Sequence, residues 1–375
     1  MASSFAQWLN SIHSHFPNLF EAGFALSMES YPSKMNHGTE SNEKRDDGAD
    51  PETHNKYKEI IATLPRSNIR HWKVDLYQYE GFWFPLQPLE GLLLAQDYFK
   101  PQPNDVILSS LPKSGTTWLK ALTFAILTRS SFGESTNPLL SRSPHDCVPF
   151  LELEIGSNPQ NFNSNVSLVA THIPYTSLPK SIISSGCKII YIFRDPKDVI
   201  VSLWHFSQKL SPEGVQTSTT EDLDLKEAFE LFCEGVSIAG SYWNHVLGYW
   251  RASLESPERI LFIKYENLKN ETIYYVKKMA EFMGYPFSLE EEVNGVVQNI
   301  INLCSFENLS SLEVNQSGPR QFLSGMVGEN NAFFRKGRVG DWKNHLTPEM
   351  ATRLYQITEQ KLSSSGLTLH ISANA

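Results

Sequence analysis

A loop of lysine and hydroxyl side chains follows the strand-like run Val106–Ser110 and leads into an apolar helical pattern. Its residues are Lys113, Ser114, Gly115, Thr116, Thr117 and Trp118. Free N–H groups at a helix N-terminus attract anions, and a lysine and three hydroxyls add further donors here. The segment predicts a phosphate-binding loop, with an ordinary capped helix start as the alternative. It is not a Walker A loop, because the lysine precedes the glycine instead of following it.

Arg194 stands directly after a second strand-like run, Lys188–Phe193, and Ser202 follows two turns into the next helix. A guanidinium at the end of a strand can hold a phosphate through two parallel hydrogen bonds. Ser202 can donate a hydrogen bond to the same group. The alternative interpretation is a surface ion pair between Arg194 and Asp198, which lies four residues further along.

His172 follows a third strand-like run, Val166–Thr171. A single histidine among eleven is more often structural than catalytic, so the residue type alone decides nothing. Its place after a strand matters more, because the carboxyl ends of parallel strands meet at one edge of a sheet. We therefore predict that Lys113, His172 and Arg194 share one crevice.

Three cations, Arg335, Lys336 and Arg338, lie within four residues near the C-terminus, with the flexible Gly337 among them. A solvated basic loop is the alternative to a second anion-binding segment. The whole chain carries 32 Lys and Arg against 41 Asp and Glu, which gives a net charge of -9. This balance argues against nucleic acid and against an anionic membrane surface as partners.

The elements that must position these residues alternate between short β-rich runs and helical patterns, which indicates parallel strands joined by crossover helices. A fourth strand is expected at Arg259–Lys264. Helix starts are marked by the capping boxes Asp224 with Glu227 and Ser288 with Glu291, and by Thr347-Pro348. The predicted fold is a single α/β, P-loop-like domain with a central parallel sheet flanked by helices.

Residues 1–58 are predicted to form a poorly ordered N-terminal extension, and residues 59–375 the folded domain. The extension contains an apolar stripe from Phe5 to Leu19 and then a polar run, Lys34–Lys58, typical of a flexible linker. No apolar stretch approaches the ~20 residues of a membrane span. The opening residues carry no basic targeting pattern and the four cysteines are widely spaced, so we expect a cytoplasmic protein.

Five motifs occur in order along the chain: L-P-K-S-G-T-T-W from Leu111, T-H-I-P from Thr171, F-R-D-P-K-D-V-I-V-S from Phe193, C-S-F-E-N-L from Cys304, and R-K-G-x-x-G-D-W-K from Arg335. Together they resemble the plant branch of the cytosolic sulfotransferases, over about Trp72–Leu369. The resemblance implies that the domain moves the sulfo group of 3'-phosphoadenosine 5'-phosphosulfate to a hydroxyl of a small hydrophobic or aromatic metabolite. It implies no metal.

The resemblance also implies a role for each motif residue. Lys113 to Thr117 would hold the 5'-phosphosulfate, and the 3'-phosphate would be held by Arg194, Ser202, Arg335, Lys336 and Gly337. The adenine would lie between Trp118 and Phe306, with Tyr265 at its edge. His172 would be the catalytic base, and Lys113 would stabilise charge on the leaving group.

The same resemblance places Phe150, Phe206 and Trp243 in the lining of the acceptor pocket. An aromatic lining suits a flat or apolar hydroxylated molecule. Flavonols, hydroxylated jasmonates, steroids and desulfoglucosinolates all satisfy that description.

Two parts of the sequence depart from the family's pattern. Ala170 stands where many animal members carry a lysine, so Lys113 must act alone or another donor must substitute. The family's short dimer motif is matched at Lys343 and Thr347, but Pro348 and Thr352 replace its valine and glutamate. We therefore expect a monomer.

Two other functions stay open at this point. Asp195 follows the strand-like run Lys188–Phe193, as a metal-binding aspartate does in an ATP- and magnesium-dependent phosphotransferase. Against it, Arg194 directly precedes this aspartate and no Walker A loop occurs. A catalytically inactive nucleotide-binding protein is the second alternative, against which the intact Lys113, His172 and Arg194 argue.

Overall fold

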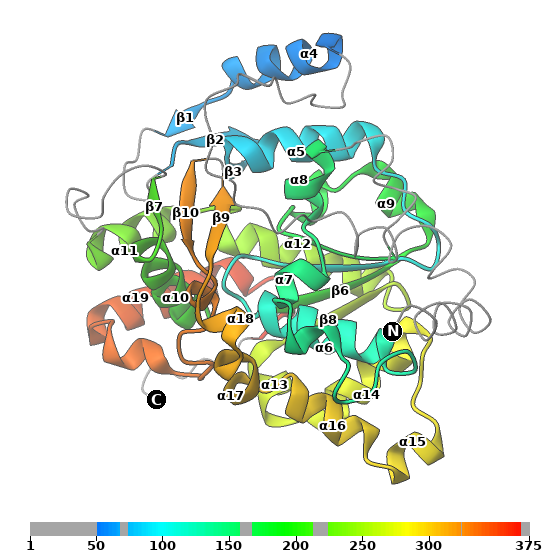
Figure 1. Cartoon of the computed structure of the whole chain (residues 1–375). Coiled ribbons are helices and arrows are strands. Elements are labelled where there is room, and N and C mark those ends of the chain that lie inside the picture. The colour runs from blue at the N-terminus through cyan, green and yellow to red at the C-terminus, as the bar shows by residue number, and fades with distance from the viewer. Residues whose placement is uncertain (1–50, 68–73, 158–166, 213–223, 324, 369–375) are drawn as a thin grey trace, which may run out of the picture.

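Four parallel strands lie at the centre of the computed structural model, in the spatial order β5-β4-β6-β8 (Figure 1). Their bounds are Leu168–Thr171 for β5, Val106–Ser110 for β4, Lys188–Phe193 for β6 and Ile260–Lys264 for β8. All four predicted strands are therefore present in one parallel sheet. The structure describes residues 51–67, 74–157, 167–212, 224–323 and 325–368, so the apolar stripe from Phe5 to Leu19 lies outside it.

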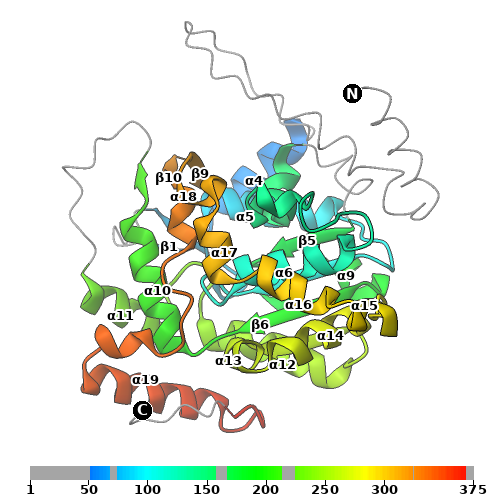
Figure 2. The same ribbon diagram turned by 60° about the horizontal axis from the view of Figure 1, so that its bottom comes forward.

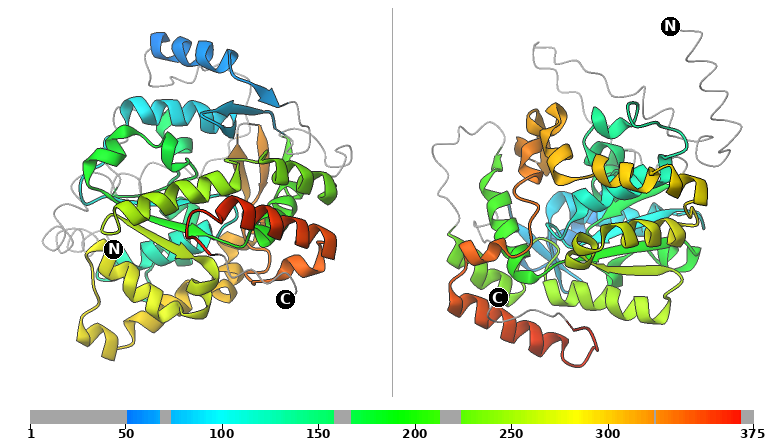
Figure 3. Two further views of the ribbon diagram at one scale, coloured as in Figure 1. Left: turned by 180° about the vertical axis from the view of Figure 1, so that it is seen from behind. Right: turned by 90° about the horizontal axis from the view of Figure 1, so that it is seen from below.

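Successive side chains of each strand point to opposite faces of the sheet, as the pleat requires. Ile107 and Ile189 belong to one buried hydrophobic cluster, whereas Leu108 and Ile190 belong to another. The first cluster includes α5 (Leu86–Tyr98), α10 (Pro196–Gln208), α12 (Tyr242–Glu255) and α19 (Pro348–Leu362). The second includes α6 (Thr116–Thr128), α14 (Thr272–Met283) and α16 (Val296–Leu303). Helices thus cover both faces, as predicted, and Figure 3 shows α19 beside α12 from behind.

The remaining strands of the described residues form two small antiparallel sheets. The first has the order β1 (Arg66–Ser67), β2 (Leu76–Tyr79), β3 (Phe82–Pro85), and the second the order β7 (Ser211–Pro212), β10 (Met326–Glu329), β9 (Pro319–Leu323). The second sheet lies beside α17 (Phe306–Ser311) and α18 (Glu313–Gln316) (Figure 2). The remaining α-helices are α4 (Pro51–Ala62), α7 (Pro144–Cys147), α8 (Leu151–Glu154), α9 (Lys180–Ser185), α11 (Leu225–Glu234), α13 (Tyr265–Asn270) and α15 (Leu289–Val293). Within the described ranges, no helix has both the length and the apolar character needed to cross a membrane.

The predicted helix starts lie where the capping residues place them. Ser288 and Glu291 form a reciprocal capping box at α15. Thr347 accepts a hydrogen bond from the backbone N–H of Met350 at the start of α19, where Pro348 is the first helical residue. Asp224 caps α11 by accepting from the backbone N–H of Lys226.

The predicted flexible linker extends too far along the chain. Residues 51–58, which we assigned to it, belong to α4. The ring of Tyr57 is buried, and its hydroxyl donates a hydrogen bond to Asp97 of α5 at 2.7 Å. The sequence prediction was wrong here because the few apolar residues of α4 lie at its C-terminal end, after a polar first turn. The boundary predicted between residues 58 and 59 therefore lies inside a helix.

Helices α5 and α8 pack closely at Gly91. A Cβ atom built there would lie 1.8 Å from the carbonyl oxygen of Glu152 in α8, so a side chain does not fit. The Glu152 carboxylate in turn accepts a hydrogen bond from the backbone N–H of His172. The contact between the two helices therefore supports the strand end that carries His172.

We expect Gly91→Ala to lower the melting temperature by several degrees. An alanine inside a helix is normally about 1 kcal/mol more favourable than glycine, whereas overpacking costs about 1–3 kcal/mol. Thermal denaturation followed by circular dichroism measures the sign of the change. Gly156→Ala is the matched control, because nothing lies within 4 Å of a Cβ atom at Gly156. A more stable Gly91→Ala variant would show that α5 and α8 separate easily.

Candidate active site

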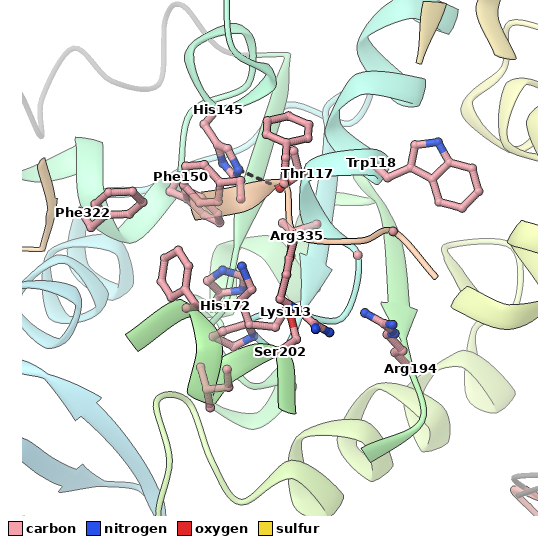
Figure 4. A pocket seen from close by; sticks show the side chains of 18 of the residues that line it. Lys113, Thr117, Trp118, His145, Phe150, His172, Arg194, Ser202, Phe322 and Arg335 are labelled. Atoms are coloured by element: carbon pink, nitrogen blue, oxygen red, sulfur yellow. Dashed lines mark hydrogen bonds between the residues drawn. The ribbon is translucent and has the colours of Figure 1, made fainter. Parts of the chain in front are cut away.

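One cavity of about 440 Å³ opens at the carboxyl ends of the four parallel strands (Figure 4). It is lined by Lys113 after β4, His172 after β5, Arg194 after β6 and Tyr265 after β8. The predicted convergence of Lys113, His172 and Arg194 is confirmed. The lining also includes Gly115, Thr116, Thr117, Trp118, Ser202, Phe306, Arg335, Lys336 and Gly337.

The loop between β4 and α6 is shaped by two residues with positive φ angles, Lys113 at 69° and Gly115 at 114°. A Cβ atom at Gly115 would lie 2.7 Å from the ring of Tyr265, so glycine is required for space as well as for conformation. The hydroxyl of Thr116 is hydrogen-bonded to that of Ser110 at 2.7 Å. Ser114 does not line the cavity: its hydroxyl is buried and has no hydrogen-bond partner among the described residues.

The half-buried Lys113 places its amine near two aromatic rings. Its Nζ lies 4.0 Å from the centroid of Phe206 and 5.7 Å from that of Phe333. Burial lowers the pKa of Lys113 to about 7, and repulsion from Arg335 and Arg194 acts in the same direction. An anion bound in the cavity would oppose both effects and hold the amine in its charged form.

His172 is oriented so that its Nε2 atom is available as a hydrogen-bond acceptor. Its Nδ1 atom lies 2.6 Å from the carbonyl oxygen of Ser110. Because a carbonyl only accepts, Nδ1 carries the proton and Nε2 carries the lone pair. Burial lowers the pKa of the ring to about 3, so the imidazole is neutral. The arrangement is that of a general base.

Two buried residues that the sequence analysis did not single out hold the backbone at His172. Glu152 accepts from the His172 N–H at 2.7 Å and from the Thr171 hydroxyl at 2.8 Å. On the other side, Nε2 of His245 donates to the His172 carbonyl oxygen at 3.1 Å. The one signal in the sequence is the pair of glutamates, Glu152 and Glu154, in the otherwise apolar segment that follows Phe150.

Arg194 combines features of both predictions, although its ion pair with Asp198 is buried and not at the surface. Its guanidinium lines the cavity and also forms an ion pair with Asp198 at 3.2 Å. Asp198 is fully buried, and it accepts hydrogen bonds from the backbone N–H groups of Gly340 and Trp342 at 2.8 and 3.1 Å. The ion pair therefore connects the end of β6 to the C-terminal basic segment.

Arg335 and Lys336 both bind the carboxylate of Asp341, Lys336 at 3.0 Å. Burial raises the pKa of Asp341, but the hydrogen bonds from these two cations outweigh it and hold that pKa well below its usual range. At Gly337, with φ of 58°, a Cβ atom would lie 2.5 Å from the ring of Phe306. The basic segment thus packs against α17 at Gly337, while the side chains of Lys336 and Arg338 remain exposed.

The cavity has a cationic half, lined by Lys113, Arg194, Arg335 and Lys336, and an aromatic half. Phe150 and Phe206, which we predicted, line it together with His145, Phe322 and Phe333. Sequence reasoning missed these last three, although Phe333 directly precedes the Phe334-Arg335 segment.

Trp243 was wrongly predicted to line the acceptor pocket. Its side chain is 1% exposed, packs against Phe232 and Tyr242, and donates a hydrogen bond from Nε1 to Thr358 of α19 at 3.1 Å. A tryptophan in the interior needs a partner for its N–H, and here that partner lies in the core between α12 and α19.

Asp195 has a structural role at the start of α10. It caps α10 by accepting from the backbone N–H of Lys197 at 2.8 Å, and it is not among the residues that line the cavity. This position removes the one sequence feature that favoured a magnesium-dependent phosphotransferase.

Comparison with known proteins agrees with the geometry. A family model described as "Sulfotransferase domain" matches residues 103–366. "Flavonol sulfotransferase-like" from Flaveria bidentis is 52% identical over 316 residues, 83% of this chain and 99% of the relative. "Cytosolic sulfotransferase 16" from Arabidopsis thaliana is 46% identical over 323 residues, 85% of this chain and 94% of the relative.

Two solved structures are similar over most of the chain. A putative steroid sulphotransferase from Arabidopsis thaliana has a TM-score of 0.66 at 37% identity, and the match covers 86% of this chain and 98% of that one. Mouse sulfotransferase SULT7A1, complexed with PAP, has a TM-score of 0.58 at 27% identity, with 77% of this chain and 95% of that one covered.

We expect His172 to remain neutral from about pH 8 down to about pH 5, because a lowered pKa leaves the ring deprotonated at every pH above it. Nitrogen-15 NMR of the histidine rings, assigned with a His172→Asn variant, should show a ring protonated on Nδ1 throughout this range. Uptake of a second proton with a midpoint near the ordinary histidine value of about 6.5 would contradict the buried, one-sided environment described here.

Proposed function

The chain belongs to the sulfotransferase family, and from that premise we propose that the cationic half of the cavity binds the donor and the aromatic half a hydroxylated aromatic acceptor. As a member it is an enzyme that transfers the sulfo group of 3'-phosphoadenosine 5'-phosphosulfate to a hydroxyl of a small metabolite. The observation that carries the residue assignment is the place of Lys113 and His172, at the adjacent ends of β4 and β5 where the two halves meet.

The residues of the cationic half fit such a donor. The Nε atoms of Arg194 and Arg335 are buried without a hydrogen-bond partner among the described residues, so each has an N–H for a phosphate oxygen. We assign the 3'-phosphate to these two groups, together with Ser202, Lys336 and the backbone at Gly337. The 5'-phosphosulfate is assigned to Lys113 and to the loop that follows it, at the N-terminus of α6.

The adenine is assigned to the rings at the far side of the cationic half. Trp118 and Phe306 line the same cavity, and Tyr265 lies edge-on to Trp118 with ring centroids 5.7 Å apart. A flat base between aromatic rings gains stacking and buries apolar area. The solved structure of mouse SULT7A1 contains PAP, which supports a 3'-phosphorylated adenine nucleotide as the ligand of this half.

The chain's own groups then divide the chemistry. When bound, the donor supplies the sulfo group and a phosphate oxygen that leaves. Nε2 of His172 accepts the proton of the acceptor hydroxyl, which makes that oxygen a better nucleophile. The Lys113 ammonium neutralises charge that builds on the leaving oxygen. The fixed loops hold both reactants in line, which accounts for most of the acceleration.

The acceptor is proposed to be a flat, hydroxylated aromatic molecule of the flavonol type. Four phenylalanines at positions 150, 206, 322 and 333 line the acceptor half. The Flaveria bidentis relative is named for flavonols, which supports this class. Hydroxylated jasmonates, steroids and desulfoglucosinolates are the competing acceptors for a substrate screen.

The expected cytoplasmic location is in line with the name of the Arabidopsis thaliana relative, "Cytosolic sulfotransferase 16".

We also propose that the protein is a monomer. Pro348, which replaces the valine of the family's dimer motif, is the first residue of α19, directly after the capping residue Thr347. Light scattering at assay concentration measures the mass directly.

We expect adenosine 3',5'-bisphosphate to raise the melting temperature, and adenosine 5'-monophosphate or ATP with magnesium to raise it little, with or without a chelator. Lys336→Ala should weaken the bisphosphate about 10- to 100-fold, the usual loss for one charge-assisted hydrogen bond, and leave the monophosphate unchanged. Lys343→Ala, an exposed lysine of the same segment, is the matched control. Stabilisation that requires ATP and magnesium would overturn the proposal.

We expect His172→Ala to reduce kcat by at least about 100-fold while the bisphosphate still stabilises the protein, because the base acts on the acceptor and not on nucleotide binding. Lys113→Met should lower kcat more than it raises the donor KM, since the charge it meets develops only during transfer. Steady-state kinetics at saturating acceptor measures both. If Lys113→Met changed the donor KM alone, the assignment of Lys113 to the leaving group would be wrong.

A further inference from the structure

Lys120 is a fully buried lysine for which the function proposed above has no use. It lies on α6, one turn after Thr116. Its Nζ is 2.9 Å from the carbonyl oxygen of Val148, 3.2 Å from Nδ1 of His145 and 3.3 Å from the centroid of the Phe150 ring. Burial and the Arg320 charge lower the pKa of Lys120 well below its ordinary value, while Glu152 and Glu154 oppose this shift. The carbonyl oxygen and the ring face both accept N–H donors, and an ammonium group has a third donor for Nδ1 of His145.

His145 lies between this lysine and the anion loop. Its Nδ1 faces Lys120, and its Nε2 is 2.9 Å from the hydroxyl oxygen of Thr117. The ring is stacked on Phe333, with centroids 3.8 Å apart, and lies nearly parallel to Phe150. Burial lowers the pKa of His145 well below its ordinary value, and the Lys120 charge acts in the same direction, so the ring is neutral. A neutral imidazole has one N–H and one lone pair.

We propose that Lys120 and His145 are positioning residues that fix the direction of the Thr117 hydroxyl. Lys120 donates to Nδ1 of His145, which places the single ring proton on Nε2. That N–H donates to the oxygen of Thr117. The hydroxyl proton of Thr117 is thereby left to point away from His145, as a donor for an anion at the N-terminus of α6.

Figure 4 shows two of these three residues, with the His145 ring pointing at Thr117 and a dashed line for the hydrogen bond between them. Without Lys120, the Thr117 hydroxyl would be equally able to donate to an unprotonated Nε2, and its proton would be turned away from the anion. The inference rests on the proposed function only in naming that anion as the 5'-phosphate end of the donor.

The same logic separates the two histidines of the cavity. His172 has a carbonyl at Nδ1 and therefore a lone pair on Nε2, whereas His145 has a lysine at Nδ1 and therefore a proton on Nε2. His145 is thus unsuited to act as the base. It is a donor that acts through Thr117.

The tautomers are the first test, and they need no nucleotide. Nitrogen-15 NMR of the wild-type protein, with His145 assigned by a His145→Gln variant, should show His145 protonated on Nε2 and His172 protonated on Nδ1. In Lys120→Met, if it folds, the preference at His145 should be lost. A wild-type His145 protonated on Nδ1, or a charged ring at neutral pH, would overturn the proposal.

The second test is a double-mutant cycle on the affinity for adenosine 3',5'-bisphosphate, measured by calorimetry. His145→Phe keeps a ring between Phe150 and Phe333 but removes the donor, and Thr117→Val keeps the shape of threonine but removes the hydroxyl. Each should weaken binding about tenfold, and the double variant should weaken it no further than either alone. Thr117→Ser and His145→Gln, which keep the hydroxyl and a donor, should bind within about threefold of wild type.

Losses that multiply in the double variant, or a His145→Phe variant that binds as wild type does, would overturn the proposal. Failure of the wild-type protein to bind the bisphosphate at all would instead overturn the proposed function. The NMR result would then decide the role of Lys120 and His145 separately.

Discussion

The buried carboxylate of Asp198 is the interaction on which the donor side of the site depends. It binds the Arg194 guanidinium at the end of β6 and two backbone N–H groups of the C-terminal segment. A buried charge is stable only when it is paired and hydrogen-bonded, and Asp198 satisfies this by joining the sheet to the segment that carries Arg335 and Lys336. The anion-binding groups from distant parts of the sequence are therefore held in place before any ligand arrives.

Lys113 is the group that this arrangement leaves uncompensated. Arg194 has Asp198 and Arg335 has Asp341, whereas no ion pair of Lys113 occurs within the described part of the chain. Its amine rests on aromatic faces, which attract a cation far less than a carboxylate does. An anion in the cavity would repay the cost of charging Lys113, so we expect binding of the proposed donor and protonation of Lys113 to favour each other.

The sequence patterns correctly predicted those site residues whose positions follow from the topology of the sheet. Lys113, His172 and Arg194 each follow a strand, and parallel strands bring their carboxyl ends together whatever the intervening loops do. The prediction for Trp243 was wrong for the opposite reason. Which face of a helix lies toward the cavity depends on the packing between α12 and α19, and no local sequence pattern encodes that packing. Glu152, His145 and Lys120 were missed because each acts through a partner more than 15 residues away along the chain.

The two histidines show why residue type alone could not assign the chemistry. His145 is buried and His172 is half-buried, both line one cavity, and burial lowers the pKa of each, so charge does not separate them. The difference lies in what faces Nδ1. A carbonyl oxygen at Ser110 forces the proton onto Nδ1 of His172 and makes Nε2 basic, while an amine at Lys120 does the reverse for His145. The roles proposed for the two rings therefore depend on β4 and α6, the elements that supply Ser110 and Lys120, as much as on the histidines themselves.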